Sequence, residues 1–177
     1  MKIALVLASA LAVSACMSSG GGKAPVNGPV TPTASPKPQP KSGPGPTTPN
    51  RVENNSFAGL LNNVRIANGA GAVAYDNRLG AAAQGHANDM LAHNYLSHTG
   101  RDGSSAGDRI TRAGYNWRTY GENIAQGQDS QSDVLKSWTN SPGHHANNIN
   151  PNFKDFGLGK AGSGSNKRWV LLLAAEN

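Results

Sequence analysis

Apolar side chains recur with helical spacing over long stretches between residues 56 and 140. Over residues 56–68 they stand at i, i+3, i+4 and i+7, as Phe57, Leu60, Leu61 and Val64, which predicts an amphipathic helix. A second helix is expected to follow Asp76, whose carboxylate can cap it, and to end near Asn94. Shorter helices are expected over residues 105–113 and 130–140, and Pro142-Gly143 should stop the last of them.

The pattern becomes extended elsewhere in the chain. Residues 69–75, GAGAVAY, are expected to form a loop, and residues 120–127, YGENIAQG, the start of a strand. Residues 155–176 predict a hairpin with a turn rich in Gly, Ser and Asn. Its second strand carries the unbroken run WVLLLAA, which is typical of a strand buried on both faces. Helices that flank a mainly antiparallel sheet, an α+β architecture, are the layered solution for these elements.

The first 50 residues differ in composition from the rest. Lys2 precedes an apolar run over residues 3–13 that ends in VSAC, so residues 1–15 are expected to be a signal peptide. VSAC also resembles the bacterial lipoprotein box, in which Cys16 would be lipidated and become the mature N-terminus; ordinary cleavage after Ala15 is the alternative. Residues 16–50 hold nine of the eleven prolines, which predicts a disordered tether before a domain over residues 51–177.

The charge of +6 is unevenly divided along the chain. Residues 1–50 carry four lysines and no acidic residue, whereas residues 51–177 carry 12 basic and 10 acidic residues and contribute only +2. The arginines are scattered and no basic run has interleaved aromatic residues, so nucleic acid is not an expected partner. Cys16 is the single cysteine, which excludes an intramolecular disulfide and a multi-cysteine zinc site.

Polar residues that can support chemistry stand at the ends of predicted elements. His98 follows the second helix, Glu122 begins a strand, and His144 lies in residues 141–151, SPGHHANNINP, which we expect to be a loop. Two histidines and one carboxylate suit a metal ion with an open coordination position, or an acid–base set. Spacing along the chain leaves both open, together with the interpretation that these are ordinary surface or core residues.

Eight segments of the chain occur in the order that is typical of bacterial CAP-superfamily domains: LNNVR, YDNRLGAAAQGHANDM, LSH, DGSSAGDRI, AGY, GENIAQG, SW and SPGHHANNINP. Residues 56–177 therefore resemble this superfamily, whose domains are also called SCP-like and are related to cysteine-rich secretory proteins, antigen 5 and pathogenesis-related 1 proteins. The resemblance implies a three-layer α-β-α sandwich with a mainly antiparallel central sheet and a cleft.

The resemblance also implies that the cleft is lined by His98, Glu122 and His144. Residues expected to support them are Asp108, Asn123, Ser141 and Asn147. If the cleft holds a metal, His98 and His144 would bind it with help from Glu122, and Zn²⁺ is the expected ion because imidazole suits it. No other cofactor is expected.

Other positions are interpreted more simply. His145 replaces an arginine that is common in bacterial relatives and is expected to be exposed, and Ser141 stands where animal members often carry a second glutamate. His86 is expected to be half-buried and His93 solvated. Arg109 is expected to anchor the short helix through local hydrogen bonds, and a cleft pair of Asp108 with Arg109 is the alternative.

The favoured hypothesis for function is an exported binding module, lipid-anchored to the bacterial cell envelope, with a lipidic, cell-wall or protein ligand. The sequence has no nucleophile elbow and no HExxH motif that would require catalysis. A metal-assisted hydrolase of peptide or cell-wall material is the alternative, because His98, His144 and Glu122 could hold zinc and activate a water. A purely structural envelope protein is the third hypothesis.

The lipoprotein interpretation predicts the behaviour of a single substitution. Because acylation of Cys16 would supply the membrane anchor, Cys16→Ser should move the protein from the membrane to the soluble fraction of fractionated cells. A variant that stays on the membrane and is processed normally would show that the anchor lies elsewhere.

Overall fold

The computed structural model describes residues 50–177, with side chains from Ser56 onward. The expected signal peptide, Cys16 and the tether lie outside this part of the chain. A 3₁₀ turn, Gly164–Asn166, lies between the last two strands. The other elements, in chain order, are α1 (Asn50–Ala67), β1 (Ala74–Tyr75), α2 (Asn77–Ala92), α3 (Ala106–Arg112), β2 (Trp117–Gln126), α4 (Gln131–Thr139), α5 (Pro142–Ile149), β3 (Asp155–Ala161) and β4 (Arg168–Glu176).

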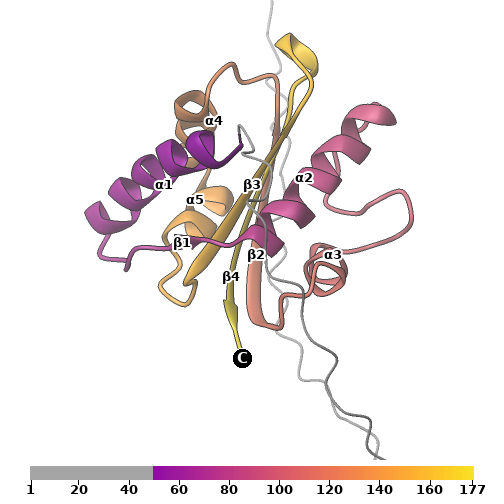
Figure 1. Cartoon of the computed structure of the whole chain (residues 1–177). Coiled ribbons are helices and arrows are strands. Elements are labelled where there is room, and N and C mark those ends of the chain that lie inside the picture. The colour runs from indigo at the N-terminus through magenta and orange to yellow at the C-terminus, as the bar shows by residue number, and fades with distance from the viewer. Residues whose placement is uncertain (1–49) are drawn as a thin grey trace, which may run out of the picture.

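The four strands form one sheet with the order β1-β3-β4-β2. Strand β4 pairs antiparallel with both β2 and β3, whereas the two-residue β1 pairs parallel with β3. In Figure 1 the helices lie in two layers, with α1, α4 and α5 on one side of the sheet and α2 and α3 on the other. The α+β three-layer sandwich with a mainly antiparallel sheet, including its C-terminal hairpin, is thus confirmed.

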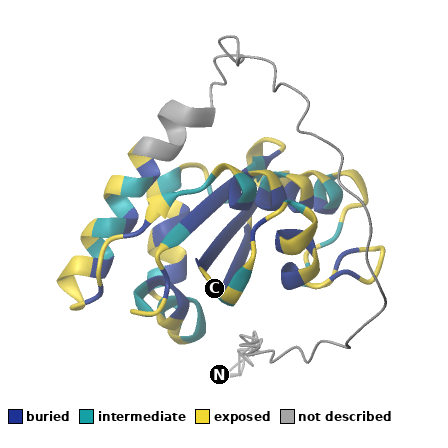
Figure 2. Cartoon of the chain, turned by 60° about the horizontal axis from the view of Figure 1, so that its bottom comes forward, coloured by how far each residue is buried: buried dark blue, intermediate teal, exposed yellow. Residues whose placement is uncertain are grey.

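Strand β4 is buried on both faces, as the run WVLLLAA predicted. Trp169, Leu171 and Leu173 pack into the cluster formed with α1 and α4. The alternate side chains Val170, Leu172 and Ala174 pack into the cluster formed with α2 and α3. Figure 2 shows the sheet as the most completely buried part of the described chain. Burying a Val or Leu side chain contributes about 1.5–3 kcal/mol, so β4 ties the two helical layers to one sheet.

Helix α2 packs directly on strand β3. It begins as expected after Asp76, whose side chain accepts hydrogen bonds from the backbone N–H groups of Arg78 and Leu79. At Gly157 of β3, a Cβ atom would lie 2.2 Å from the carbonyl carbon of Leu79, and at Gly159 a Cβ would lie 2.4 Å from that of Ala83. The two glycines therefore let the helix backbone approach the strand more closely than any side chain would allow.

Three elements differ from the sequence-based expectation. Helix α1 begins at Asn50 rather than at Ser56, because no proline or glycine interrupts residues 50–58. Residues 74 and 75 of the expected loop form β1, since their backbone finds partners along the edge of β3. Residues 142–149 form helix α5 instead of a loop, because a proline is tolerated in the first turn of a helix, where its missing N–H is not needed.

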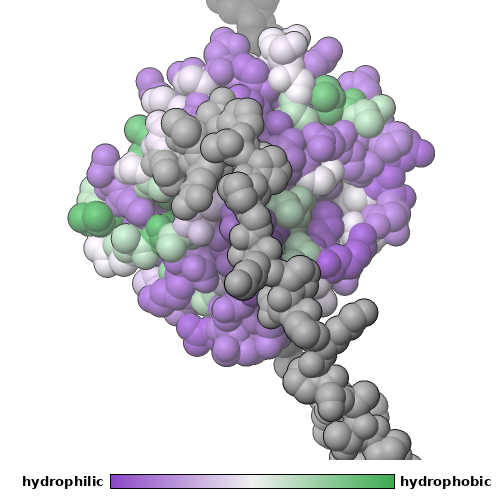
Figure 3. Space-filling model, in the orientation of Figure 1, coloured by the Kyte–Doolittle hydropathy of each residue, from purple (hydrophilic) through white to green (hydrophobic). Residues whose placement is uncertain are grey.

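Hydrophilic residues dominate the face of the domain that is drawn in Figure 3, and its hydrophobic patches are small and separate. Ile66 and Leu96 are the large hydrophobic side chains that remain exposed among the described residues. None of the described helices is both long enough and apolar enough to cross a bilayer.

The close approach of α2 to β3 predicts a strong effect of one methyl group. Gly157→Ala should lower the free energy of unfolding by about 1–3 kcal/mol or more. The new Cβ would clash with the backbone of α2, which cannot move aside as a flexible side chain can. Urea denaturation followed by the fluorescence of the buried tryptophans measures this loss.

Gly59→Ala is the matched control, because Gly59 is exposed in α1 and a Cβ there meets no atom within 4 Å. That variant should gain about 0.5–1 kcal/mol from the higher helix propensity of alanine. Equal stability of the two variants would contradict the packing argument.

Candidate functional site

Strand β2 sends adjacent side chains to opposite helical layers. Glu122 lies opposite Leu172 of β4, which packs with α2 and α3, so Glu122 faces that layer. Asn123 lies opposite Leu171, which packs with α1 and α4, and faces the layer that also contains α5. Because β2 is an edge strand, loops of both layers can meet beside it.

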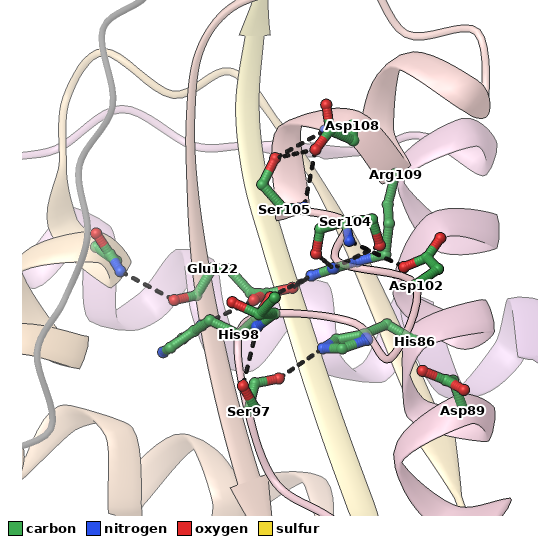
Figure 4. A network of polar contacts seen from close by, with 12 residues as sticks. His86, Asp89, Ser97, His98, Asp102, Ser104, Ser105, Asp108, Arg109 and Glu122 are labelled. Atoms are coloured by element: carbon green, nitrogen blue, oxygen red, sulfur yellow. Dashed lines mark hydrogen bonds and ion pairs between the residues drawn. The ribbon is translucent and has the colours of Figure 1, made fainter. Parts of the chain in front are cut away.

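The carboxylate of Glu122 is bound by two partners, His98 and Arg109. Its Oε1 lies 2.8 Å from Nδ1 of His98, and its Oε2 accepts a hydrogen bond of 2.7 Å from Nη2 of Arg109. The Glu122 side chain is only 4% exposed and that of Arg109 9%, so this ion pair is shielded from water. Figure 4 shows the three side chains meeting beside β2. Two charge-assisted contacts hold the carboxylate in one position.

Arg109 also holds the loop that carries His98. Its guanidinium donates to the backbone carbonyl of His98 over 3.1 Å and to that of Ser104 over 2.8 Å. The expected local hydrogen bonds are present at Ser104, before α3, and Arg109 also reaches Glu122 on β2, which the sequence did not predict. Ala106, Gly107, Arg109 and Ile110 are the buried residues of α3, and an arginine at such an inward position of a helix indicates a buried partner.

His144 reaches the site from the opposite layer, on helix α5. Its Nδ1 lies 3.0 Å from the hydroxyl oxygen of Ser141, a residue expected to support the site. The amide of Asn123 donates to the backbone carbonyl of His144 over 3.0 Å and to Oδ1 of Asn148 over 2.9 Å. Asn147 in turn donates to Oδ1 of Asn123 over 2.9 Å. These amides attach α5 to β2 beside Glu122.

A buried arginine fixes the far end of α5. Arg65 of α1 is fully buried and donates to the backbone carbonyls of Gly71, Asn148, Asn150 and Phe153. The last carbonyls of a helix lack hydrogen-bond donors within the helix. Here the guanidinium of Arg65 in α1 supplies the donors for the carbonyls of Asn148 and Asn150. Neither Arg65 nor Asn148 was expected from the sequence to contribute to the site.

The two imidazoles of the site lie close enough to influence each other. Burial lowers the pKa of His144, and repulsion from the charged form of His98 lowers it further. Nε2 of His98 is buried, and no donor or acceptor among the described residues reaches it. The site therefore combines a histidine held by Glu122 with a second histidine that favours its neutral form.

As a metal site, this arrangement offers few ligands. Within residues 50–177, no group of three or more His, Cys, Asp or Glu side chains is placed to hold a metal ion. Both oxygens of Glu122 already contact His98 and Arg109, which makes Glu122 a partner of a histidine rather than a third ligand. The described residues of the site could therefore provide two ligands to a metal ion, the imidazoles of His98 and His144.

Other candidate residues have partners away from Glu122 or differ from expectation in burial. Asp108 does not join Glu122; it forms a capping box with Ser105 at the start of α3, because its position in the first turn suits that role. His145 is half-buried in α5 rather than exposed. His86 is 2% exposed rather than half-buried, and His93 is exposed, as expected, and contacts Asp89.

A cavity of about 640 Å³ lies beside the site, between α2, α3 and the loop that joins them. Arg109 and Ser104 line it, whereas His98, Glu122 and His144 do not. The described domain thus has two adjacent polar regions, with Arg109 between them.

Comparison with known proteins reveals a family match. The model of the cysteine-rich secretory protein (CAP) family matches residues 58–173. The chain is 38% identical over 106 residues to the uncharacterised protein YkwD of Bacillus subtilis, an alignment that covers 60% of this chain and 41% of YkwD. It is 30% identical over 100 residues to the uncharacterised membrane protein YlbC of the same bacterium, covering 56% of this chain and 29% of YlbC.

Solved structures also resemble the domain. An extracellular SCP-domain protein of Bacillus anthracis has a TM-score of 0.64 and 29% identity, covering 75% of this chain and 45% of that one. An outer surface protein of Borrelia burgdorferi has a TM-score of 0.66 at 19% identity, covering 73% of this chain and 97% of that one, which supports the fold alone. The chain aligns with less than half the length of the two Bacillus subtilis relatives.

The buried ion pair predicts a large loss of stability on neutralising Glu122. Glu122→Gln keeps the shape of the side chain but leaves the buried charge of Arg109 without its counterion, which should lower the free energy of unfolding by about 3–5 kcal/mol. Urea denaturation of the full-length chain measures the change.

Asp102→Asn provides the control, because the Asp102–Arg112 pair has a similar N–O distance of 2.9 Å but is more than half exposed. That substitution should cost less than about 1 kcal/mol. A similar loss from both substitutions would mean that burial does not set the strength of the Glu122–Arg109 pair.

Proposed function

The chain belongs to the cysteine-rich secretory protein (CAP) family, and from this premise we propose that it is an exported module whose cleft at His98, Glu122 and His144 binds a ligand of the cell envelope. Its structural neighbours include an extracellular protein and an outer surface protein, which supports export. In this proposal a lipidated Cys16 anchors the chain to a membrane of the envelope, and residues 16–50 tether the domain to that anchor.

One observation carries the proposal of a ligand. Nε2 of His98 is buried and has no partner within the described residues, although its ring is held in place through Nδ1. A buried polar atom without a hydrogen bond costs about 1–3 kcal/mol. A ligand that pairs with this nitrogen would remove the cost. The unpaired nitrogen is therefore the atom through which we expect a ligand to bind.

Glu122 determines which kind of group that is. A carboxylate can only accept, so Nδ1 of a neutral His98 carries the proton and Nε2 presents a lone pair. The cleft is thus suited to a hydroxyl or N–H donor, or to a metal ion. The head group of a lipid, a cell-wall sugar and a protein side chain can all provide such a donor.

A metal would fit the cleft only through its two imidazoles. His98 and His144 would hold the ion, and Glu122 would orient His98, which is the usual arrangement of a carboxylate behind a zinc-bound histidine. The ion would supply Lewis acidity and a site for a ligand donor atom. Glu122 is committed to Arg109 and His98, so it is poorly placed to act as a general base, and we favour ligand binding over hydrolysis.

The proposal is tested by exchanging each histidine for asparagine in the chain with Cys16→Ser, which removes the expected anchor. An asparagine amide can replace Nδ1, toward Glu122 in His98→Asn and toward Ser141 in His144→Asn, but it has no Nε2. Three probes are used: purified cell-wall fragments, phospholipid vesicles and Zn²⁺. Both variants should bind the preferred probe at least about 10-fold more weakly.

His145→Asn serves as the control, because His145 is adjacent to His144 in α5, whereas the oxygens of Glu122 contact His98 and Arg109. It should retain full binding in co-sedimentation with the two envelope probes and in calorimetry with zinc. Binding of none of the three probes, or equal loss in all three variants, would refute a binding role for the His98–His144 cleft. Zinc binding alone would establish a metal site, and hydrolysis would then require turnover that a chelator abolishes.

A further inference from the structure

The cavity between α2 and α3 is separate from the cleft at His98, Glu122 and His144. Small residues of α2 form one wall, and the loop before α3 forms another, with Arg101, Asp102 and Ser104. Its volume of about 640 Å³ lies within the range of about 300–1,000 Å³ that is usual for small-molecule sites. A ligand of the size of a sugar would fit it.

His86 supplies this cavity with a hydrogen-bond acceptor of fixed identity. Its Nε2 lies 2.8 Å from the backbone carbonyl of Ser97, and since a carbonyl can only accept, Nε2 carries the proton. Burial lowers the pKa of His86 and keeps the ring neutral, although the charge of Glu122 opposes this. Nδ1 is therefore a lone-pair acceptor, and within the described chain it has no partner.

Arg109 supplies a donor in the same wall. Its two terminal nitrogens bind Glu122, Ser104 and the carbonyl of His98, but the buried Nε–H has no acceptor among the described residues. His86 and Arg109 are both at least nine-tenths buried, and both line the cavity. A buried polar atom without a hydrogen bond lowers the stability of the fold, and a ligand group that bonded to either atom would remove that free-energy cost.

We propose that this cavity is a second ligand site, which takes a sugar whose hydroxyl groups accept from Nε–H of Arg109 and donate to Nδ1 of His86. A hydroxyl is suited to both atoms because it can accept and donate. A metal cation would be repelled by Arg109, and an anion would leave the lone pair of His86 without a donor. A hydroxylated ligand can satisfy both atoms.

The rest of the lining agrees with a sugar. Asp89 and Asp102 carry acceptor oxygens and Arg101 and Arg112 carry donors, although Asp102 and Arg112 also bond to each other. The small side chains of Ala81 and Ala82 offer an apolar surface for the C–H groups of a ring. Nδ1 of His86 and Nε of Arg109 are shielded from water in this structure, so the proposed binding requires a side-chain shift at the cavity wall that lets a ligand reach them. The site does not depend on the function proposed for the cleft.

Two variants of the full-length chain, purified in mild detergent, separate the site from its surroundings. Gly85 lines the cavity on the exposed side of α2, and a Cβ there meets no atom within 4 Å, so Gly85→Leu should fill the cavity without strain. His86→Gln can still donate to Ser97 through its amide, at the position of Nε2, while removing the acceptor Nδ1. Gly59→Leu in α1 is the matched control, since Gly59 is also helical, exposed and open.

The measurement is an NMR titration of each chain with glucose, N-acetylglucosamine and glucuronate. At least one sugar should give saturable shifts at the amides of Ala82, His86 and Ser104, with affinity reduced at least about 10-fold in Gly85→Leu and His86→Gln and unchanged in Gly59→Leu. Melting temperatures verify that each variant is folded. The proposal is overturned if no sugar saturates, which would leave the cavity to water, or if Gly85→Leu binds like the unmodified chain.

Discussion

The double burial of strand β4 is the constraint on which the rest of the domain depends. Its odd and even positions are both apolar, so each face of the sheet must be covered by helices. The two helical layers then meet beside the edge strand β2, where His98 arrives from one layer and His144 from the other. The place where these side chains meet is thus a consequence of packing both faces of one strand.

Burial of Glu122 determines the contacts of the side chains around it. A carboxylate that is 4% exposed is tolerated only with compensating partners, and Arg109 and His98 together occupy both of its oxygens. Arg109 in turn holds the loop of His98, so charge compensation and loop geometry are coupled. The same arginine lines the neighbouring cavity, so the two regions share one side chain.

Helix α5 is held by polar contacts rather than by an apolar face. Asn123, Asn147 and Asn148 connect it to β2, and Arg65 binds carbonyls at and beyond its end. Pairing of buried polar atoms stabilises such a network, and within the described residues Nδ2 of Asn148 is a member that has no partner. The network explains why a segment rich in asparagine and histidine, which looks like surface loop, is partly buried and carries a site residue.

The sequence by itself determined the elements with strong periodicity: the helices around Phe57, Asp76 and Trp138, and the apolar strand that ends the chain. These follow from local propensity and from the spacing of apolar residues, both of which depend on residues close together in the sequence. The ordered CAP-like segments added the layers of the fold and three of the residues that meet beside β2. The remaining features of the fold and the site were decided by tertiary structure.

Tertiary contacts decided the helical state of residues 142–149, the two-residue strand β1, the burial of His86 and the hydrogen-bond partners of Arg109 and Arg65. Each depends on partners distant in sequence, such as Arg65 with Asn148 or Arg109 with Glu122. Asp108 was expected at the cleft, but a local hydrogen bond to Ser105 uses its carboxylate. Long-range contacts have no period along the chain, so only the packed structure decides which charged groups meet and which polar atoms remain for a ligand.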